Sequence, residues 1–182
     1  MSTSDYAHFV AIPWCARHLQ GDRIVARSAP CRALKTTTQD SLLSDTLNSD
    51  RAVSKMIQVY EEPILPSERV DQLKTFVTLG SGLNGHPDVC HGGIVVALLD
   101  EAVGSLGPLN RKRKSMPDGA YMTAYLNTSF VKPVSTPTTI LVRSWFTSVQ
   151  GRKYFSEGTI EDESGTVLAR AEALFVLVRS PL

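Results

Sequence analysis

One short stretch of the chain carries backbone and side-chain groups that can do chemistry. It reads NGHPDVCHGGIVVALLDEAVG over residues 84–104, and it contains Gly92 and Gly93 followed by Asp100 and Glu101. Glycines at a helix start leave unpaired N–H groups open to a substrate carbonyl, because no Cβ blocks the approach. The N–H of Gly92, together with that of Gly93, therefore predicts an oxyanion hole. A plain Gly-Gly turn leading into the helix is the alternative.

Asp100 places a carboxylate on a helix whose other residues are mostly apolar. Burying a carboxylate is costly and raises its pKa, so its presence needs a compensating interaction or a function. An Asp bonded to a strand backbone or to an arginine is the structural alternative. Glu101 is interpreted as a rim residue or as a partner for a basic side chain. Carbonyl-polarising glycines and a helix carboxylate together favour acyl transfer to water.

The motif HGGIVVALLDEAVG resembles the signature of hot-dog-fold acyl-CoA thioesterases of the phenylacetate-pathway and human thioesterase-superfamily type. In that signature an Asp follows the His by nine residues, and here Asp100 follows His91 at that spacing. The resemblance continues through TAYLNTSFVKP (123–133), GRKYF (151–155) and DESGTVLARAEALFVLV (162–178). It covers about residues 70–178 and implies an antiparallel sheet wrapped around one long helix.

The resemblance also implies catalytic roles for individual residues. Gly92 would supply the oxyanion N–H, and Asp100 would act as nucleophile or general base; both roles stay open. Thr123 matches a hydroxyl position that helps to place the water in some relatives. His91 would shape the start of the helix rather than act as a base. The expected reaction is hydrolysis of an acyl-CoA thioester, without a cofactor or a metal ion.

Substrate contacts are expected from a loop and from two basic segments. Several family members carry an Asn six residues before the His; here that position is Gly85, and Asn84 lies one position further back. The basic run over residues 111–114 either is a solvated loop or attracts the phosphates of coenzyme A. Arg152 and Lys153 share that possibility.

Two other motifs have weaker readings. Residues 80–85 satisfy G-x-G-x-x-G, but a dinucleotide fingerprint must open a helix directly within a βαβ unit, and His86-Pro87 follows here. The pair Cys90-His91 could supply a thiol nucleophile and its base, but residues adjacent in the chain do not normally face each other. The four histidines form no spaced metal-binding cluster, and three cysteines without a C-x-x-C spacing predict a reducing compartment.

Composition limits the class of partner and the location. The chain of 182 residues is 42% hydrophobic and 20% charged, as is usual for a globular domain. Its formal net charge of +1 disfavours a dedicated nucleic-acid binder. No apolar run reaches the roughly 18 residues needed to span a bilayer. We expect a cytoplasmic protein, with a weak organellar presequence within residues 17–35 as the alternative.

Hydrophobic periodicity predicts an α+β domain over residues 57–182, after an N-terminal extension, residues 1–56, that is partly helical. A helix is expected over residues 41–56, and another from about Gly93 to Leu106, ended by Gly107-Pro108. The second is apolar nearly all round, which indicates burial inside a curved sheet. Strands are expected at residues 57–60, 73–79, 121–131, 138–149, 153–161 and 166–178. Short connections between the last four predict that consecutive strands among them pair antiparallel.

Helix geometry predicts an active site shared by two chains. Gly92 and Asp100 are eight residues apart, which is about 12 Å along a helix axis. One helix therefore cannot present both groups to a single carbonyl, whereas a two-fold partner helix can complete the site. We expect a homodimer, and the resemblance implies that dimers pair into tetramers in some relatives. The alternatives to a thioesterase are a non-catalytic acyl-CoA-binding or regulatory module and a hot-dog dehydratase, whose Asp/His pair has no match here.

Overall fold

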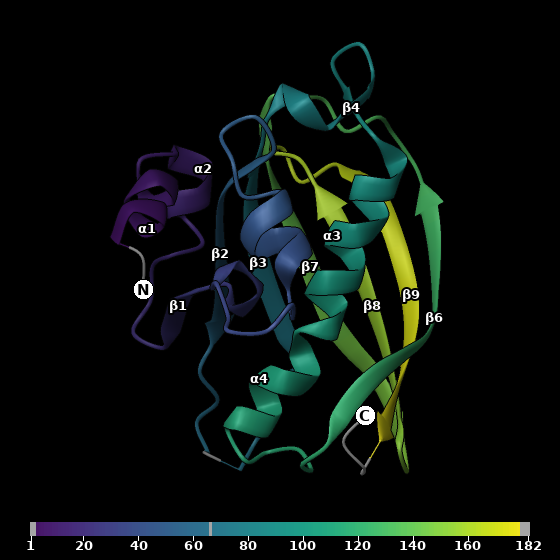
Figure 1. Ribbon diagram of the computed structural model, residues 1–182. Coiled ribbons are helices and arrows are strands. Elements are labelled where there is room, and N and C mark those ends of the chain that lie inside the picture. The colour runs from purple at the N-terminus through teal and green to yellow at the C-terminus, as the bar shows by residue number, and fades with distance from the viewer. Residues whose placement is uncertain (1–2, 66, 179–182) are drawn as a thin grey trace.

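The computed structural model describes residues 3–65 and 67–178. Its long elements form a single seven-stranded antiparallel sheet that curves around one helix (Figure 1). The strand order is β1-β2-β3-β7-β8-β9-β6. The elements are α1 (Thr3–Val10), α2 (Pro13–Ala16), β1 (Ile24–Ser28), η1 (Pro30–Arg32), η2 (Leu42–Thr46), β2 (Val53–Glu61), β3 (Gln72–Leu79), η3 (Ser81–Leu83), β4 (Asn84–His86), β5 (Val89–Cys90), α3 (Gly92–Gly104), α4 (Leu106–Lys112), β6 (Ala120–Phe130), β7 (Thr138–Gln150), β8 (Lys153–Glu161) and β9 (Val167–Val178).

The two faces of the sheet are covered by different parts of the chain. Helix α3 packs on the concave face, and its Leu98 and Leu99 lie fully buried against β-strand residues such as Ile160. On the other face α1 and α2 pack against β2 and β3, with Phe9 resting on Phe76 at a ring-centroid distance of 5.8 Å. The α+β class and the sheet around a central helix, both predicted from the sequence, are confirmed.

The segment before residue 57 contributes directly to the sheet. Strand β1 pairs with β2, and Cys31 and Leu43 pack in the core around α3. The expected helix over residues 41–56 is wrong. Only η2 is helical there, as one π-helical turn, and β2 already begins at Val53 because its apolar residues are buried against β3 and the helices. Sheet pairing overrides the partly helical spacing of the leucines.

The central helix does not end where the sequence pattern placed its end. The expected stop at Gly107-Pro108 is wrong, because α4 follows α3 after a single non-helical residue, Ser105, and runs to Lys112. Proline is tolerated in the first turn of a helix, where its missing N–H would have no intrahelical partner. A Cβ on Gly107 would lie 2.8 Å from the ring of Tyr121, so this glycine permits close packing of α4 on β6.

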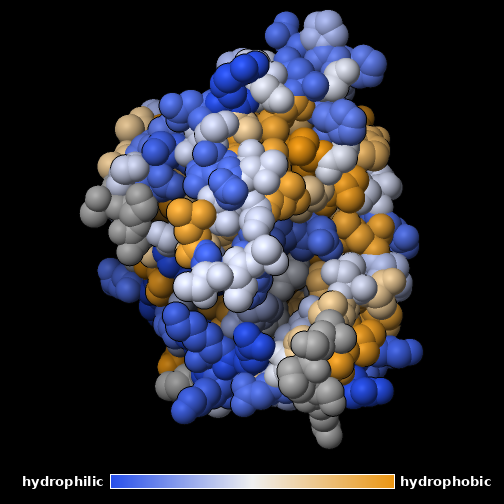
Figure 2. Space-filling model, viewed as in Figure 1, coloured by the Kyte–Doolittle hydropathy of each residue, from blue (hydrophilic) through white to orange (hydrophobic). Residues whose placement is uncertain are grey.

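Helix α3 is buried on only one side, which corrects the expectation of burial all round. Val95, Leu98 and Leu99 face the sheet, whereas Ile94 and Val96 stay partly exposed. Figure 2 shows hydrophobic side chains gathered over the first half of α3 and along β6.

The whole stretch Gly92–Lys112 is long and apolar enough to cross a membrane by length and composition. The core helix of a soluble domain passes the same test, and half of an 18-residue window within this stretch is buried inside the fold.

Strand β6 lies at an edge of the sheet, next to β9 rather than next to β7. The expected pairing of consecutive strands is therefore correct for β7–β8 and β8–β9 and wrong for β6–β7. The connection, residues 131–137, extends to at most about 23 Å. That length crosses the three inter-strand steps of about 4.8 Å from β6 to β7. A short connection can therefore join two strands that are not neighbours in the sheet, as well as two strands of a hairpin.

Candidate functional site

The start of α3 is organised by His91. It is the N-cap residue, and its Nδ1 accepts a 2.9 Å hydrogen bond from the N–H of Gly93. The N–H groups of Ile94 and Val95 point to the His91 carbonyl. Among the described residues nothing accepts a hydrogen bond from the N–H of Gly92. Of the two predicted oxyanion donors, the N–H of Gly93 is thus engaged by the His91 ring, and the N–H of Gly92 is left without an acceptor among the described residues.

A small cavity lies beside this helix start, and we call it the Gly92 cavity. It has a volume of about 370 Å³. A Cβ built on Gly92 would lie 3.4 Å from the ring of Phe130, so glycine leaves the approach to its N–H open. The other lining residues are mostly apolar: Val89, Cys90, Val95, Val131, Lys132, Pro133 and Val134. The surroundings of the unpaired N–H are thus poor in competing hydrogen-bond acceptors.

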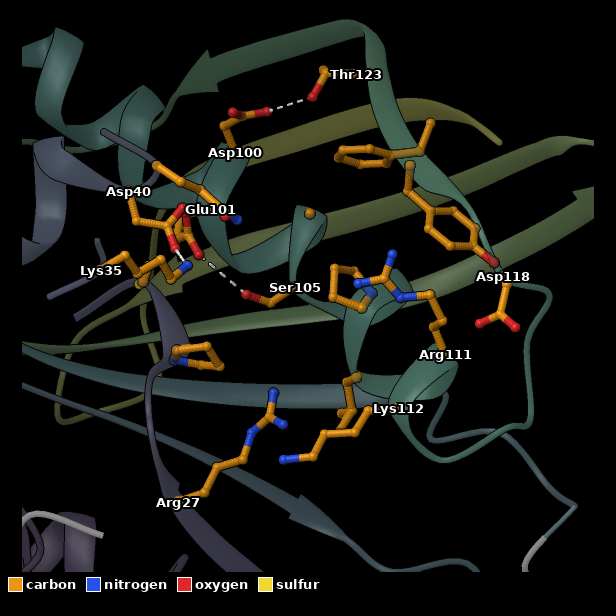
Figure 3. A pocket seen from close by; sticks show the side chains of 18 residues that line it. Arg27, Lys35, Asp40, Asp100, Glu101, Ser105, Arg111, Lys112, Asp118 and Thr123 are labelled. Atoms are coloured by element: carbon orange, nitrogen blue, oxygen red, sulfur yellow. Dashed lines mark hydrogen bonds and ion pairs between the residues drawn. The ribbon is translucent and has the colours of Figure 1, made fainter. Parts of the chain in front are cut away.

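Asp100 lies eight residues along α3 on the side that faces β6. Its Oδ1 accepts a 3.2 Å hydrogen bond from the hydroxyl of Thr123. The structure therefore brings together two residues that the sequence resemblance had linked to the same reaction. Because one oxygen of the carboxylate is held by Thr123, the orientation of the other oxygen is defined. Figure 3 shows this pair at the rim of a larger cavity.

This larger cavity, which we call the Asp100 cavity, has a volume of about 660 Å³. Its walls come from α3 and α4, from the start of β6, and from the segment of residues 27–40. Unlike the Gly92 cavity, it is lined by many ionisable groups, as Figure 3 shows: Arg27, Lys35, Asp40, Asp100, Glu101, Arg111, Lys112 and Asp118. Gly92 does not line it, so a single chain keeps the two predicted catalytic groups apart.

Glu101 lines the same cavity and is half-buried, and no lysine, arginine or histidine among the described residues lies within ion-pair distance of it. Burial raises the pKa of its carboxyl above the ordinary value, and the nearby Asp40 and Asp100 add to that rise. Contacts with Cys31 and Ser105 act in the opposite direction; the Ser105 hydroxyl donates to Oε1 at 3.3 Å. The raised pKa of Glu101 could have been expected from the sequence by the argument used for Asp100, because both place a carboxylate on an apolar helix.

The remaining predicted substrate contacts lie elsewhere. The amide of Asn84 is engaged by protein groups: it contacts the Thr136 hydroxyl in the segment before β7, and the amide orientation that satisfies both of its ends also pairs it with Ser81 and Asp88. Because these groups already pair with the Asn84 side chain, the arrangement does not favour the predicted contact between Asn84 and a substrate carbonyl. Arg152 and Lys153 are exposed at the β7–β8 turn and do not line the Asp100 cavity.

The basic run over residues 111–114 is split by the fold. Arg111 and Lys112 end α4 and line the Asp100 cavity, so this half of the run lies where an anionic substrate group can reach it. Arg113 instead forms an ion pair with Glu62. Within residues 3–65 and 67–178, no three His, Cys, Asp or Glu side chains are grouped so as to hold a metal ion.

Residues 88–169 match the model of the family described as "Thioesterase superfamily". Acyl-coenzyme A thioesterase THEM4 of Mus musculus is 31% identical over 98 residues, which are 53% of this chain and 39% of that protein. Verlamelin biosynthesis protein B of a Lecanicillium species is 29% identical over 168 residues, covering 75% of this chain and 71% of that protein. The chain thus spans less than half of the mouse thioesterase that it matches.

Solved structures give the same result. A thioesterase superfamily protein superposes with a TM-score of 0.53 at 26% identity, over 67% of this chain and 53% of that one. A Bacillus halodurans protein solved with CoA superposes with a TM-score of 0.50 at 26% identity, over 58% of this chain and 66% of that one. The fold is the hot-dog fold of these thioesterase structures. The resemblance seen in the sequence is confirmed by these comparisons, in which residues 88–169 match the thioesterase superfamily model.

Proposed function

We propose that the protein hydrolyses acyl-CoA thioesters to a free acid and CoA. The observation that carries this proposal is the N–H of Gly92, which has no acceptor among the described residues and opens into an apolar cavity at a helix N-terminus. Such a donor stabilises the negative charge that develops on a thioester oxygen during attack. The family match and the acyl-CoA thioesterase among the relatives support the same reaction class.

Asp100 supplies the second part of the reaction. Either its carboxylate removes a proton from water as the water oxygen attacks the carbonyl carbon, or the carboxylate attacks first and water then cleaves the anhydride. In both routes the C–S bond breaks, the CoA thiolate leaves, and a proton passes to its sulfur. The hydroxyl of Thr123 holds Oδ1 of Asp100, so we assign Thr123 to positioning the carboxylate.

We further propose that each complete site is built from two chains. Gly92 and Asp100 line different cavities, and they are separated by about 12 Å of helix. Strand β6, with exposed Met122, Tyr125 and Phe130, lies at the sheet edge beside the partly exposed side of α3. A second copy related by a two-fold axis would cover this apolar face and bring its Asp100 to the first chain's Gly92.

The test is release of free thiol from a panel of acyl-CoAs, with chains of increasing length and with an aromatic acyl group. Hydrolysis of at least one acyl-CoA that falls with Asp100→Asn supports the proposal. The alternative, a non-catalytic acyl-CoA-binding module, predicts that acyl-CoAs bind in a calorimeter while no thiol is released by the wild-type protein. That pair of results would reject the assigned reaction.

A further inference from the structure

Arg27 brings a positive charge to the Asp100 cavity without a carboxylate partner. It reaches the cavity wall from β1 and is half-buried. It donates hydrogen bonds to the amide oxygen of Gln58, and its guanidinium carbon lies 5.9 Å from the centroid of the Tyr60 ring. Within residues 3–65 and 67–178 no carboxylate lies within ion-pair distance of it. A guanidinium with unused N–H groups facing a cavity can donate hydrogen bonds to an anionic ligand.

The position of Arg27 is held by a chain of hydrogen bonds that leads to α3. Gln58 is fully buried and accepts from Nε of Arg27 at 3.1 Å and from Nη2 at 2.6 Å. Its amide nitrogen donates to the Ser105 hydroxyl at 2.9 Å, and Ser105 in turn donates to Glu101. Gln58 thereby holds the planar fork of Arg27 in one orientation, with Nη1 left for a ligand. This is the arrangement of a pre-organised binding group.

Other basic side chains of the cavity add positive charge near Arg27. Lys112 and Arg111 line the same cavity, and Figure 3 shows Arg27 and Lys112 at the end away from the Asp100–Thr123 pair. Of the acids in the cavity, Asp40 is paired with Lys35, and Glu101 accepts a hydrogen bond from the Ser105 hydroxyl. Arg27 and Lys112 therefore form a cationic end to which a second anion can bind.

We propose that this cationic end binds an anionic oxygen group of the substrate, either a carboxylate at the far end of the acyl chain or a phosphate of CoA. The inference rests on the proposed thioester hydrolysis only for the position of the reacting carbonyl, which it places beside Asp100. Ser105, through which Arg27 is linked to α3, is five residues further along the helix, or about 8 Å. A substrate that spans both points carries its anion several bonds away from the thioester.

The experiment measures binding by calorimetry on the Asp100→Asn background, so that no ligand is consumed. Three ligands separate the two anion sources: adipoyl-CoA carries both a terminal carboxylate and phosphates, hexanoyl-CoA carries phosphates only, and hexanoyl-pantetheine carries neither. The variant is Arg27→Gln. Its matched control is Arg23→Gln, because Arg23 is exposed and pairs with Glu61 outside the cavity.

If the carboxylate is bound, Arg27→Gln weakens adipoyl-CoA about tenfold to a hundredfold, as for loss of hydrogen bonds to a charged group, and leaves hexanoyl-CoA unchanged. If a phosphate is bound, both CoA esters weaken alike and the pantetheine ester does not. Should Arg27→Gln fail to fold, Lys112→Gln at the exposed end of α4 tests the same anion, with a smaller loss in the same direction. Equal effects on all three ligands, or effects no larger than those of Arg23→Gln, overturn the proposal.

Thiol release by the wild-type protein, measured with the same three thioesters, separates this inference from the proposed reaction. If the wild-type protein releases no thiol from any of these thioesters, hydrolysis is rejected. A dependence of binding on Arg27 would then still establish the anion site. Conversely, active hydrolysis with no dependence on Arg27 rejects the anion site alone.

Discussion

The two ends of helix α3 form cavities of opposite character. At its start, Gly92 offers a backbone N–H to a small cavity walled by Phe130 and other apolar side chains. Towards its end, Asp100 and Glu101 open into a cavity lined by ionisable groups from four segments of the chain. The first end can stabilise an oxyanion and holds no base in its lining. The second holds carboxylates and lacks an unpaired helix-start donor.

This difference supports our proposal that one chain holds two half-sites rather than one complete site. Thioester hydrolysis needs the oxyanion donor and the carboxylate around the same carbonyl group, whose C=O bond is only about 1.2 Å long. The helix holds its two ends about 12 Å apart, because a helix is stiff and its rise is constant. The exposed apolar residues along β6 lie between the two half-sites, where a second copy would join them.

The largest effect should follow from Asp100→Asn, which tests the carboxylate half-site. We expect kcat to fall by about 10²-fold or more, because the amide can neither accept a proton nor attack. Folding should be unaffected, since the Asn oxygen still accepts the bond from Thr123. Asp118→Asn, at an exposed position of the same cavity wall, is the matched control. Turnover near the wild-type rate in Asp100→Asn would remove Asp100 from the mechanism.

Mixing two inactive variants tests whether the half-sites of different chains combine. Gly92→Leu should block its cavity, because even a Cβ already lies 3.4 Å from Phe130. When Gly92→Leu and Asp100→Asn chains are mixed and exchange, random pairing makes half of the dimers mixed, each with one intact site. Thiol release should therefore return to about a quarter of the wild-type rate. Exchange shown by mass spectrometry without any return of activity would contradict the shared site.

Much of the local structure could be predicted from the sequence, because it depends on nearby residues. Strand β8 has the predicted bounds, and α3 begins within one residue of its predicted start, where His91 and two glycines form a cap. Pairing across the sheet is different, since the position of β6 beside β9 depends on residues far apart in the chain. The prediction that the helix ends at Gly107-Pro108 was also wrong. A proline near Gly107 is compatible with a second helix that begins just before it.

The sequence predicted those parts of the candidate site whose residues lie close together in the chain. Gly92, His91 and Asp100 share one stretch, and their spacing carried the resemblance. The network around Glu101 joins Cys31, Gln58 and Ser105, which the fold brings together from three separate elements. No pattern in the sequence relates those positions, so the polarity of the Asp100 cavity could not be foreseen.

A smaller effect is expected from Glu101→Gln and concerns stability. The pKa of Glu101 is raised in the folded protein above its unfolded value of about 4.3, chiefly by burial. The folded state therefore keeps this proton to higher pH, and the associated stability is present at pH 4 and lost as the pH rises through the folded pKa. Glu101→Gln removes that loss, so its Tm should exceed that of the wild type near neutral pH.

The increase should be about 2–4 °C if the buried charge costs about 1 kcal/mol, and it should vanish near pH 4. Thermal melts over this pH range measure it. Glu163→Gln, at an exposed turn, controls for the loss of one negative charge. A Tm difference that is the same at every pH would show that Glu101 acts through packing and not through its charge.

The smallest effect should come from Cys90→Ala, beside the Gly92 half-site. Cys90 is 5% exposed, and burial raises the pKa of its thiol to about 11. A thiol with that pKa stays protonated at neutral pH and is a poor nucleophile. Its contact with the His91 carbonyl, at 3.8 Å, is weak. We expect Cys90→Ala to keep most of the kcat and to resist thiol-blocking reagents. Complete loss of turnover in a variant with a wild-type Tm would instead make Cys90 the nucleophile, and the Gly92 end would then need no carboxylate from a second chain.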